Sequence, residues 1–301
     1  MKLKKQHRGT VLTIFVCILA LILNLVLSWQ IFRKYLSLHQ QLKLDMITPG
    51  VISVSMLIPD GMTTQEAKQT FIRLTDGFER EYPGFGIDLH LYDDDEIYQQ
   101  DLETSSPVVF SVTDGEEGIA LSAMTGELKN SYLADMSAFE NAVPLSFEIP
   151  VIYRYGIMTQ TQEKTPVESA DLDEELKNHT DFHELLEYPA NPVFSVSSDL
   201  ALMEQYPEFS GMIDVTPVSE NGQIQKIYTD FLGINPGSDG NSQKIGMFWI
   251  EYLLSEEAQS ILFAEHYGRF PLHEKAFDNA VMHHQQCEIF GEYKSALKGE
   301  N

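Results

Sequence analysis

The sequence predicts an α/β fold that follows a single membrane-spanning helix, and two observations predict this arrangement, while a third excludes a disulfide-stapled fold. Residues 9–32 contain no Asp, Glu, Lys or Arg. After residue 50, β-branched strand patterns alternate with helical patterns in which apolar residues recur every three or four positions. Only Cys287 lies beyond the membrane segment, so no disulfide can form within the outer domain. A chain of 301 residues is long enough for one large domain or two lobes.

The N-terminal segment has the length and composition of a membrane anchor. In a helix, residues 9–32 reach about 36 Å, which is enough to cross a hydrocarbon core of ~30 Å. The alternative is a cleaved signal peptide, but "LNLVLSWQIFRKY" offers no small-x-small cleavage site. Basic residues concentrate before the span, which places residues 1–8 in the cytoplasm and the C-terminal part outside. We expect a single-pass cell-membrane protein with a juxtamembrane linker at residues 33–50 and an extracytoplasmic domain.

The charge of the outer part excludes one class of partner. All 45 Asp and Glu residues, but only 13 of the 20 Lys and Arg, lie in residues 45–301, a formal charge of −32. A surface this acidic repels phosphate backbones, so nucleic acid is not an expected partner.

The first half of the outer part alternates strand and helix patterns. The expected helix at 63–83 begins at a Thr cap and ends at Pro83, and strands flank it on both sides. Because strand, helix, strand implies a parallel unit, this region predicts an open parallel sheet wrapped by helices. The further expected elements are strands at 51–58, 86–92 and 107–112, a helix at 94–102 with Asp93 or Asp94 as its N-cap, and a short helix near residues 120–128.

Late in the chain, residues 247–277 read "MFWIEYLLSEEAQSILFAEHYGRFPLHEKAF", which predicts one amphipathic helix that ends at Gly268. Its apolar residues recur three or four positions apart, which suits a helix that covers the face of a sheet. Ser238 and Asp239, or Asn241 and Ser242, are its N-cap candidates. Periodicity alone favours the alternative, an ordinary amphipathic core helix in any α/β domain, so the order of the surrounding segments carries the inference.

Six segments in order resemble the bacterial extracellular solute-binding proteins of the sugar-binding type, the receptors of ABC transporters. They are the first strand, "EREYPGFGIDLHLY" (79–92), "GELKNSYLADMSAF" (126–139), "VPLSFEIPVIYRYG" (143–156), "GMIDVTPVSENGQ" (211–223) and the late amphipathic segment. The resemblance implies an α/β, two-lobed, periplasmic-binding-protein-like fold. It implies a first lobe of residues 51–148 plus 227–275 and a smaller second lobe of residues 149–226 plus 276–301.

The sequence departs from this family in the second lobe. Where family members carry a long helical stretch, this chain has a short connection in which "TPVESADLDEEL" (165–176) is a faint remnant. The family often places a Trp after the strand that here reads "VFSVSSDLALMEQ", but Ser198, Asp199 and Leu200 follow it, and the two Trp residues, Trp29 and Trp249, lie elsewhere. These departures predict a reduced second lobe and weaker stacking on a sugar ring.

Ligands of open α/β sheets sit beyond the carboxyl ends of the strands, so we look for polar and aromatic side chains near those ends. Asp60 follows the first strand, the two tyrosines lie on the crossing strand, Ser198 and Asp199 lie in a polar loop, and Phe231 precedes "GINPGSD". For each of them, packing within the core or loop capping is the structural alternative. The resemblance also implies hinge motion between the lobes, with residues 148–153 and 215–219 as hinge candidates. The candidate ligand-binding residues are Asp60, Tyr153, Tyr155, Ser198, Asp199 and Phe231.

Catalytic, metal and cofactor sites are not expected. His179 and His183 are spaced i, i+4, but the segment is not H-E-x-x-H and no third ligand is evident, so a solvated acidic helix is preferred. "HHQQCE" (283–288) and "YDDDEIY" (92–98) also lack a recognised metal pattern. The sequence contains no G-x-S-x-G, P-loop or G-x-G-x-x-G motif.

These observations predict a membrane-anchored solute-binding-like protein, not an enzyme, that captures a small solute such as a carbohydrate or a peptide-like molecule. The resemblance implies ABC permease subunits as its partners. The alternative is a degenerate binding-protein domain that acts as a sensor ectodomain or accessory interaction module, which the reduced second lobe favours. Genes for permease subunits beside this gene would favour the transport function. A neighbouring kinase gene or secretion operon would favour the accessory role.

Overall fold

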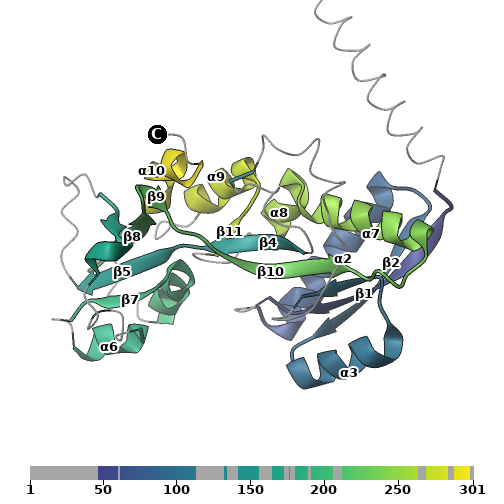
Figure 1. The fold of residues 1–301 in the computed structure, drawn as a ribbon, viewed down its shortest axis with the longest axis horizontal. Coiled ribbons are helices and arrows are strands. Elements are labelled where there is room, and N and C mark those ends of the chain that lie inside the picture. The colour runs from purple at the N-terminus through teal and green to yellow at the C-terminus, as the bar shows by residue number, and fades with distance from the viewer. Residues whose placement is uncertain are drawn as a thin grey trace, which may run out of the picture. The chain divides into compact units, whose positions relative to one another are not determined.

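The computed structural model (Figure 1) describes residues 47–59, 62–112, 132–133, 142–155, 165–172, 176, 180–188, 191–205, 212–263, 269–283 and 288–298. Gly50–Asn301 forms one compact unit, and Met1–Pro49 is a separate unit. No helix in the described part of the chain is both long and apolar enough to cross a bilayer. The predicted anchor at residues 9–32 and the short helix expected near residues 120–128 lie outside the described residues.

The first sheet has six strands in the order β11-β4-β10-β3-β1-β2. Strand β1 pairs in parallel with β2 and β3, as the strand-helix-strand pattern predicts, whereas β10 is antiparallel to both β3 and β4. The sheet therefore combines strands that precede residue 149 with strands that follow residue 226. Its strands are β1 (Gly50–Leu57), β2 (Phe85–Tyr92), β3 (Val109–Ser111), β4 (Val143–Glu148), β10 (Ile227–Ile234) and β11 (Arg269–Pro271).

The second sheet has the order β6-β8-β5-β7, with β9 paired to β8. Strand β5 is antiparallel to both β7 and β8, and β6 is parallel to β8. A short α-helix and two 3-10 helices accompany it. These elements are β5 (Pro150–Tyr155), β6 (Val167–Glu168), η2 (Ser169–Asp171), α6 (Phe182–Glu187), β7 (Val193–Val196), η3 (Ser197–Gln205), β8 (Ile213–Glu220) and β9 (Gln223–Ile224).

Helix α2 (Thr64–Glu81) begins and packs as the sequence predicts. The Thr63 hydroxyl accepts a hydrogen bond from the Glu66 backbone N–H, and the Glu66 carboxylate accepts one from the Thr63 N–H at 2.9 Å, which completes a capping box. The apolar positions of α2 form one buried stripe, which anchors the helix on the core of the first sheet. This stripe consists of Ala67, Phe71, Leu74 and Phe78.

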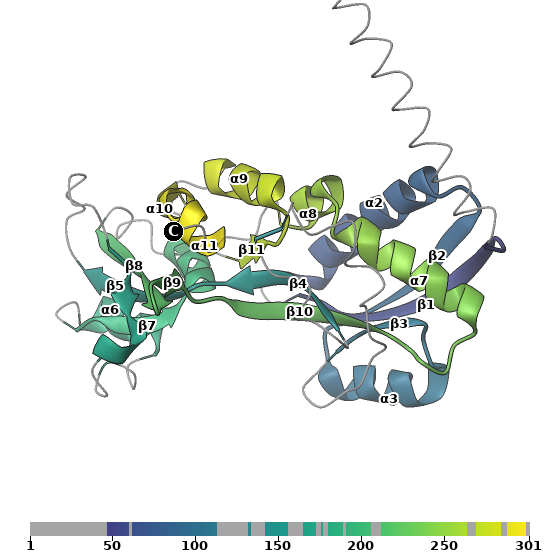
Figure 2. The same ribbon diagram turned by 45° about the horizontal axis from the view of Figure 1, so that its top comes forward.

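Helices cover both faces of the first sheet. Helix α3 (Asp95–Ser105) lies on the face opposite α7 (Gly240–Leu253) (Figure 2). The predicted N-cap is confirmed at Asp94, whose side chain accepts a hydrogen bond from the Ile97 N–H at 3.0 Å. The Ser55 hydroxyl of β1 donates to the Asp101 carboxylate of α3 at 2.7 Å, so a partly buried polar contact fixes α3 on its face.

The late amphipathic segment forms two helices rather than one, so the prediction of a single helix from 247 to Gly268 is wrong. The first is α7, whose predicted N-cap is confirmed at Asp239, and the second is α8 (Glu256–Leu262). The break falls at Ser255, whose hydroxyl accepts a hydrogen bond from the Ala258 N–H at 3.2 Å and caps the new helix. Apolar spacing does not detect this break, because both helices turn apolar residues toward the same core.

The C-terminal helices contact elements of both sheets. Helix α9 (Glu274–His283) packs on α8 and on β11, α10 (Glu288–Glu292) packs on α9, and α11 (Lys294–Lys298) packs on β9. Lys294 and Lys298 bind Glu274 at 2.9 and 2.6 Å, which ties α11 to the start of α9. Residues 276–301, which the family resemblance places with the second lobe, therefore contact the first sheet as well.

Candidate functional site

Two crossovers join the sheets, and the first is nearly continuous. Only Ile149 separates the end of β4 from the start of β5. The Ile149 N–H donates to the Ser197 hydroxyl at 2.9 Å, and the Ser197 N–H donates to the Ile149 carbonyl at 2.8 Å. Both residues are fully buried. Ser197, at the start of η3, therefore fixes the backbone where the chain passes from one sheet to the other.

The second crossover returns the chain from β9 to β10 through Gln225 and Lys226. It follows the tight β8–β9 turn, where Asn221 and Gly222 have φ values of 54° and 78°. The first crossover lies within the predicted hinge range of 148–153. The second lies after residue 224, beyond the predicted range of 215–219.

Three charged side chains form a buried network beside the first crossover. Arg269 Nη2 lies 3.2 Å from Glu148 Oε1, and Arg269 Nη1 lies 3.4 Å from Asp230 Oδ1. The Ser146 hydroxyl also donates to Asp230, and it lies 2.7 Å from the Thr229 hydroxyl. Arg269 is 6% exposed and Glu148 is 7% exposed. The charges beside the crossover are thus paired with one another, as buried charges must be.

Asp230 reaches this network through an unusual backbone conformation. Its φ is 56° in the middle of β10, a left-handed value that Asp adopts more readily than most residues. The strand keeps its register with β4 on both sides, since Thr229 pairs with Ser146 and Phe231 with Pro144. The Arg269 and Ser146 bonds to the Asp230 carboxylate stabilise this conformation.

Among the predicted ligand-binding residues, Tyr153 is a core residue. Its side chain has no exposed surface, and its hydroxyl donates to the Val196 carbonyl at 2.7 Å. Its ring makes an edge contact with Phe182, with centroids 5.0 Å apart. Tyr153 therefore holds β7 and α6 on β5, the packing role that was the structural alternative for this position.

Tyr155 and Phe231 lie in different sheets, and Asp60 lies outside the described residues. Tyr155, at the far end of β5 from the crossover, is 40% exposed, and its hydroxyl lies 3.2 Å from Met212 Sδ. Phe231 is a partly buried residue of β10 in the first sheet, and its carbonyl accepts a bond from the Val112 N–H at 2.8 Å.

Asp199 belongs to a polar cluster of the second sheet. Its carboxylate accepts a hydrogen bond from the Ser195 hydroxyl of β7. Asp181, the N-cap of α6, and His183 of α6 act on it electrostatically. Burial raises the pKa of Asp199 above its ordinary value and the Asp181 charge adds to this, whereas the Ser195 bond and His183 oppose it. Its neighbour Ser198, also a predicted site residue, is partly buried.

Sequence reasoning missed the partners of Asp199. His183 Nδ1 lies 3.0 Å from Asp181 Oδ1, and Asp181 caps α6 by accepting a bond from the His183 N–H at 2.9 Å. The D-x-H spacing at a helix start was a visible signal for this local pair. Its proximity to Asp199 depends on how α6 packs against β7, which the sequence does not display.

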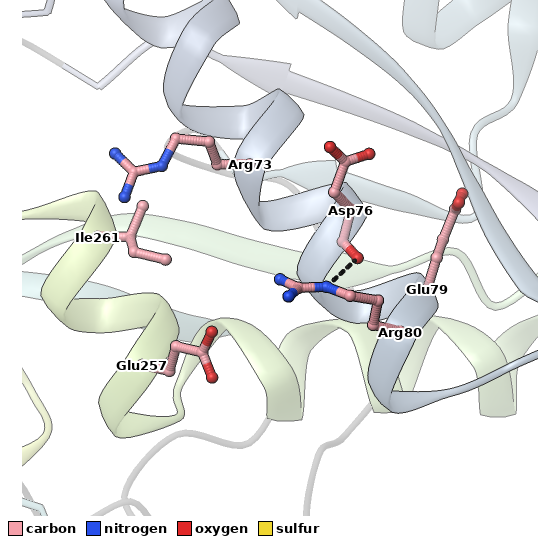
Figure 3. A pocket seen from close by; sticks show the side chains of 6 residues that line it. All are labelled: Arg73, Asp76, Glu79, Arg80, Glu257 and Ile261. Carbon is pink, nitrogen blue, oxygen red and sulfur yellow. Dashed lines mark hydrogen bonds between the residues drawn. The ribbon is translucent and has the colours of Figure 1, made fainter.

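The structure contains a groove of about 580 Å³ between α2 and α8 (Figure 3). Arg80 Nε donates to the Asp76 carbonyl oxygen at 3.2 Å, and Glu257 faces this pair from α8. The groove is open and carries charges of both signs, so it is unlike the enclosed, mainly apolar pockets that bury small ligands. Its lining residues, none of which is a predicted site residue, are Arg73, Asp76, Glu79, Arg80, Glu257 and Ile261.

A smaller cavity of about 300 Å³ lies between α8 and α9. It is lined mainly by apolar surface from Phe263, Ala276 and Ala280 and contains no predicted site residue. Across the described ranges, no group of three or more His, Cys, Asp or Glu side chains is placed to hold a metal ion. The His179–His183 pair and the "HHQQCE" segment lie only in part within those ranges, because His179 and residues 284–287 fall outside them.

The sequence matches no protein-family model and no curated protein sequence. Solved structures match over most of the chain. The maltodextrin-binding protein MalE1 from L. casei BL23 matches with a TM-score of 0.54 at 14% identity, over 83% of this chain and 84% of that one.

Two further solved structures match this chain over a similar share of its length. A family 1 extracellular solute-binding protein from Alicyclobacillus acidocaldarius matches with a TM-score of 0.54 at 10% identity, over 83% of this chain and 86% of that one. A cyclic α-maltosyl-1,6-maltose binding protein from Arthrobacter globiformis matches with a TM-score of 0.53 at 9% identity, over 84% of this chain and 95% of that one. The chain therefore has the fold of the family 1 extracellular solute-binding proteins, as its sequence resemblance predicted.

Proposed function

We propose that this chain is a membrane-anchored, extracytoplasmic solute-binding protein that captures a small solute, a carbohydrate or similar molecule, for an ABC-type importer. The observation that carries the proposal is the fold, which matches receptors named for maltodextrin and maltosyl-maltose binding over more than four-fifths of each chain. In this chain, two crossovers join the two sheets. Such connections permit hinge closure of two lobes on a ligand. The fold is shared with binding proteins rather than enzymes, in keeping with a sequence that lacks catalytic motifs.

Within this proposal, the solute contacts Asp199 and Ser198 from the second sheet and Phe231 from the first. Asp199 supplies a hydrogen-bond acceptor for hydroxyl groups, and Phe231 an apolar ring for the face of a sugar. Tyr153 acts indirectly, because its hydrogen bond to Val196 positions the strand that precedes the Ser198–Asp199 segment. Tyr155 remains a candidate contact, as does Asp60, which lies outside the described residues.

Replacing Asp199 with alanine is expected to weaken solute binding about tenfold or more, because a hydrogen bond to a charged group contributes about 1.5–3 kcal/mol. Phe231→Ala is expected to weaken it as well, through the lost apolar contact. The measurement is isothermal titration calorimetry of the full chain in lipid nanodiscs with maltodextrins and short peptides. Glu103→Ala, an exposed position on α3, is the control. Solute binding that survives both site substitutions unchanged would remove this site.

The membrane anchor is a separate part of the proposal. Because residues 9–32 are followed by no cleavage signal, we expect the chain to remain in the membrane fraction with its N-terminus intact. N-terminal sequencing of the protein from isolated membranes checks this. A mature N-terminus beyond residue 28 would contradict it and would indicate a cleaved signal peptide instead.

A specific observation favours the alternative, an accessory or sensor module that does not transport. Tyr153 is sequestered in the core, and the charged groups beside the first crossover are paired with one another rather than left open for a solute. Under this alternative the full chain binds no solute and co-purifies with a neighbouring membrane protein that is not a permease. Co-purification with permease subunits supports the transport function.

A further inference from the structure

The last two helices, α10 and α11, form a segment that contacts both sheets and is here called the strap (residues 288–298). Toward the first sheet, the fully buried Phe290 ring makes an edge contact with Phe270 of β11, with centroids 5.0 Å apart. Toward the second sheet, α11 packs on β9. Asp214 of β8 also acts electrostatically on Tyr293, which lies between the two helices of the strap. The strap therefore spans the region where the chain crosses from one sheet to the other.

Ion pairs fix the strap on α9. Lys294 Nζ lies 2.9 Å from Glu274 Oε1 and 2.6 Å from Asp278 Oδ1, and Lys298 Nζ lies 2.6 Å from Glu274 Oε2. The Lys294, Lys298 and Glu274 side chains are only 22–26% exposed, so water screens these pairs less than it screens pairs on the open surface. Because α9 packs on β11, these pairs hold α11 in place relative to the first sheet.

The strap is also attached to the second crossover. Lys226 of this crossover donates hydrogen bonds through Nζ to the carbonyl oxygens of Leu297, in α11, and of Leu133. The Leu133 N–H in turn donates to the Leu272 carbonyl, just after β11, at 2.9 Å. Leu297 is 1% exposed, so its side chain is buried as well. The strap thus contacts the first sheet, the second sheet and one of the two connections between them.

The strap lies on one side of the crossover strands, and helices α3 and α6 lie on the other. Figure 1 shows α9 and α10 above β4, β5 and β10, with α3 and α6 below these strands, and the arrangement persists in the rotated view of Figure 2. Two bodies that rotate about a connection close on one side only by separating on the other. Closure of the sheets on the α3–α6 side would therefore pull α11 away from β9 or from α9.

We propose that the strap holds the two sheets in the arrangement of this structure and that they close on the α3–α6 side only when α11 detaches. The crossovers are short enough to act as hinges, since they consist of Ile149 in one case and of Gln225 and Lys226 in the other. Detachment exposes the buried Leu297 side chain or breaks the ion pairs with Glu274, and both changes cost free energy. The strap therefore restrains the hinge whether or not a solute is present.

Distances between two spin labels, measured by double electron–electron resonance, test the proposal in the full chain in nanodiscs without any solute. Gln100→Cys on α3 and Glu187→Cys on α6 carry the labels at exposed positions, after Cys17→Ser and Cys287→Ser have removed the native thiols. With the strap in place we expect one narrow distance distribution. When the strap is detached we expect a second, shorter distance, because the sheets are then free to close on the α3–α6 side.

Two variants detach the strap. A chain that ends at residue 287 lacks it altogether, and Leu297→Asp places a charge at a buried position, which is expected to release α11 alone. Met282→Asp introduces the same charge at a position of α9 that is 72% exposed, and this control should keep the wild-type distribution. Circular dichroism checks that each variant is folded, and hydrogen–deuterium exchange of residues 288–298 checks that Leu297→Asp releases the helix.

The shorter distance in the truncated chain and in Leu297→Asp, but not in Met282→Asp, is the expected result. The wild-type distribution in a folded chain that ends at residue 287 would overturn the proposal. If the truncated chain does not fold, Leu297→Asp decides the question, because a released α11 with an unchanged distance would show that the strap does not restrain the sheets. Since no solute is present, these outcomes are separate from those that test the proposed solute binding.

Discussion

Replacing Arg269 with methionine is expected to lower the free energy of unfolding by about 3–5 kcal/mol. The substitution keeps most of the side-chain length but removes the cation that pairs with Glu148 and Asp230, 3.2 and 3.4 Å away. Both carboxylates would remain in a site where Arg269 is 6% and Glu148 is 7% exposed. Chemical denaturation monitored by tryptophan fluorescence measures the loss, since Trp249 is fully buried in the same unit.

The control for this prediction is Lys275→Met, which breaks an ion pair with Glu256 at 3.1 Å between exposed side chains. Exposed pairs contribute at most about 1 kcal/mol, so this variant should remain close to wild type. A second variant, Arg269→Met with Glu148→Leu, should recover part of the loss because it removes one of the uncompensated charges. Equal effects of Arg269→Met and Lys275→Met would contradict the assignment of a buried charge network.

Replacing Gln259 with leucine is expected to cost about 3 kcal/mol or more, because it leaves several buried backbone groups without partners. The Gln259 amide donates to the carbonyls of Leu145 at 2.9 Å and Leu253 at 3.2 Å. Its carbonyl accepts from the N–H groups of Leu272 at 2.7 Å and His273 at 3.3 Å. One fully buried side chain thus joins α8 to β4, to the end of α7 and to the segment after β11.

Thermal and denaturant unfolding of Gln259→Leu checks this prediction. Gln100→Leu makes the same chemical change at an exposed position of α3, and its expected effect is within about 0.5 kcal/mol of zero. A Gln259→Leu variant as stable as the Gln100→Leu variant would show that water or rearranged backbone satisfies the four groups.

The sequence predicted the elements whose signals are local. The Thr63 cap, the apolar stripe of α2 and the flanking strands are all encoded within about 40 neighbouring residues, and each lies where it was expected. The same holds for the caps at Asp94 and Asp239. Cap residues and apolar spacing act through contacts three or four residues apart, so a single sequence contains enough information to locate them.

Contacts between residues that are far apart in the sequence could not be predicted in this way. Glu148 and Arg269 are 121 residues apart in the sequence and meet only because β11 pairs with β4. The burial of Tyr153 likewise depends on α6 and β7 closing over β5. A tyrosine on a strand that crosses between the lobes looks the same in sequence whether it faces a solute or the core, and the sequence therefore predicted this position as a ligand contact.

The break between α7 and α8 is an intermediate case. The S-E-E-A sequence at Ser255 is a recognisable helix start, with a hydroxyl cap and two acidic residues in the first turn. The continuous apolar pattern concealed it, because the two helices present their apolar faces to a common core. Giving the cap more weight than the periodicity would have located this boundary.

The measurement that tests the proposed function most directly is a calorimetric titration of the wild-type full chain in nanodiscs with a series from maltose to maltoheptaose, together with short peptides. If the chain captures a solute between its two sheets, at least one member of the series will give saturable heat at a stoichiometry of about one, with the negative heat-capacity change of apolar burial. If no member of the series gives saturable heat while the same preparation is folded and binds a neighbouring membrane protein, solute capture is contradicted and the accessory role takes its place.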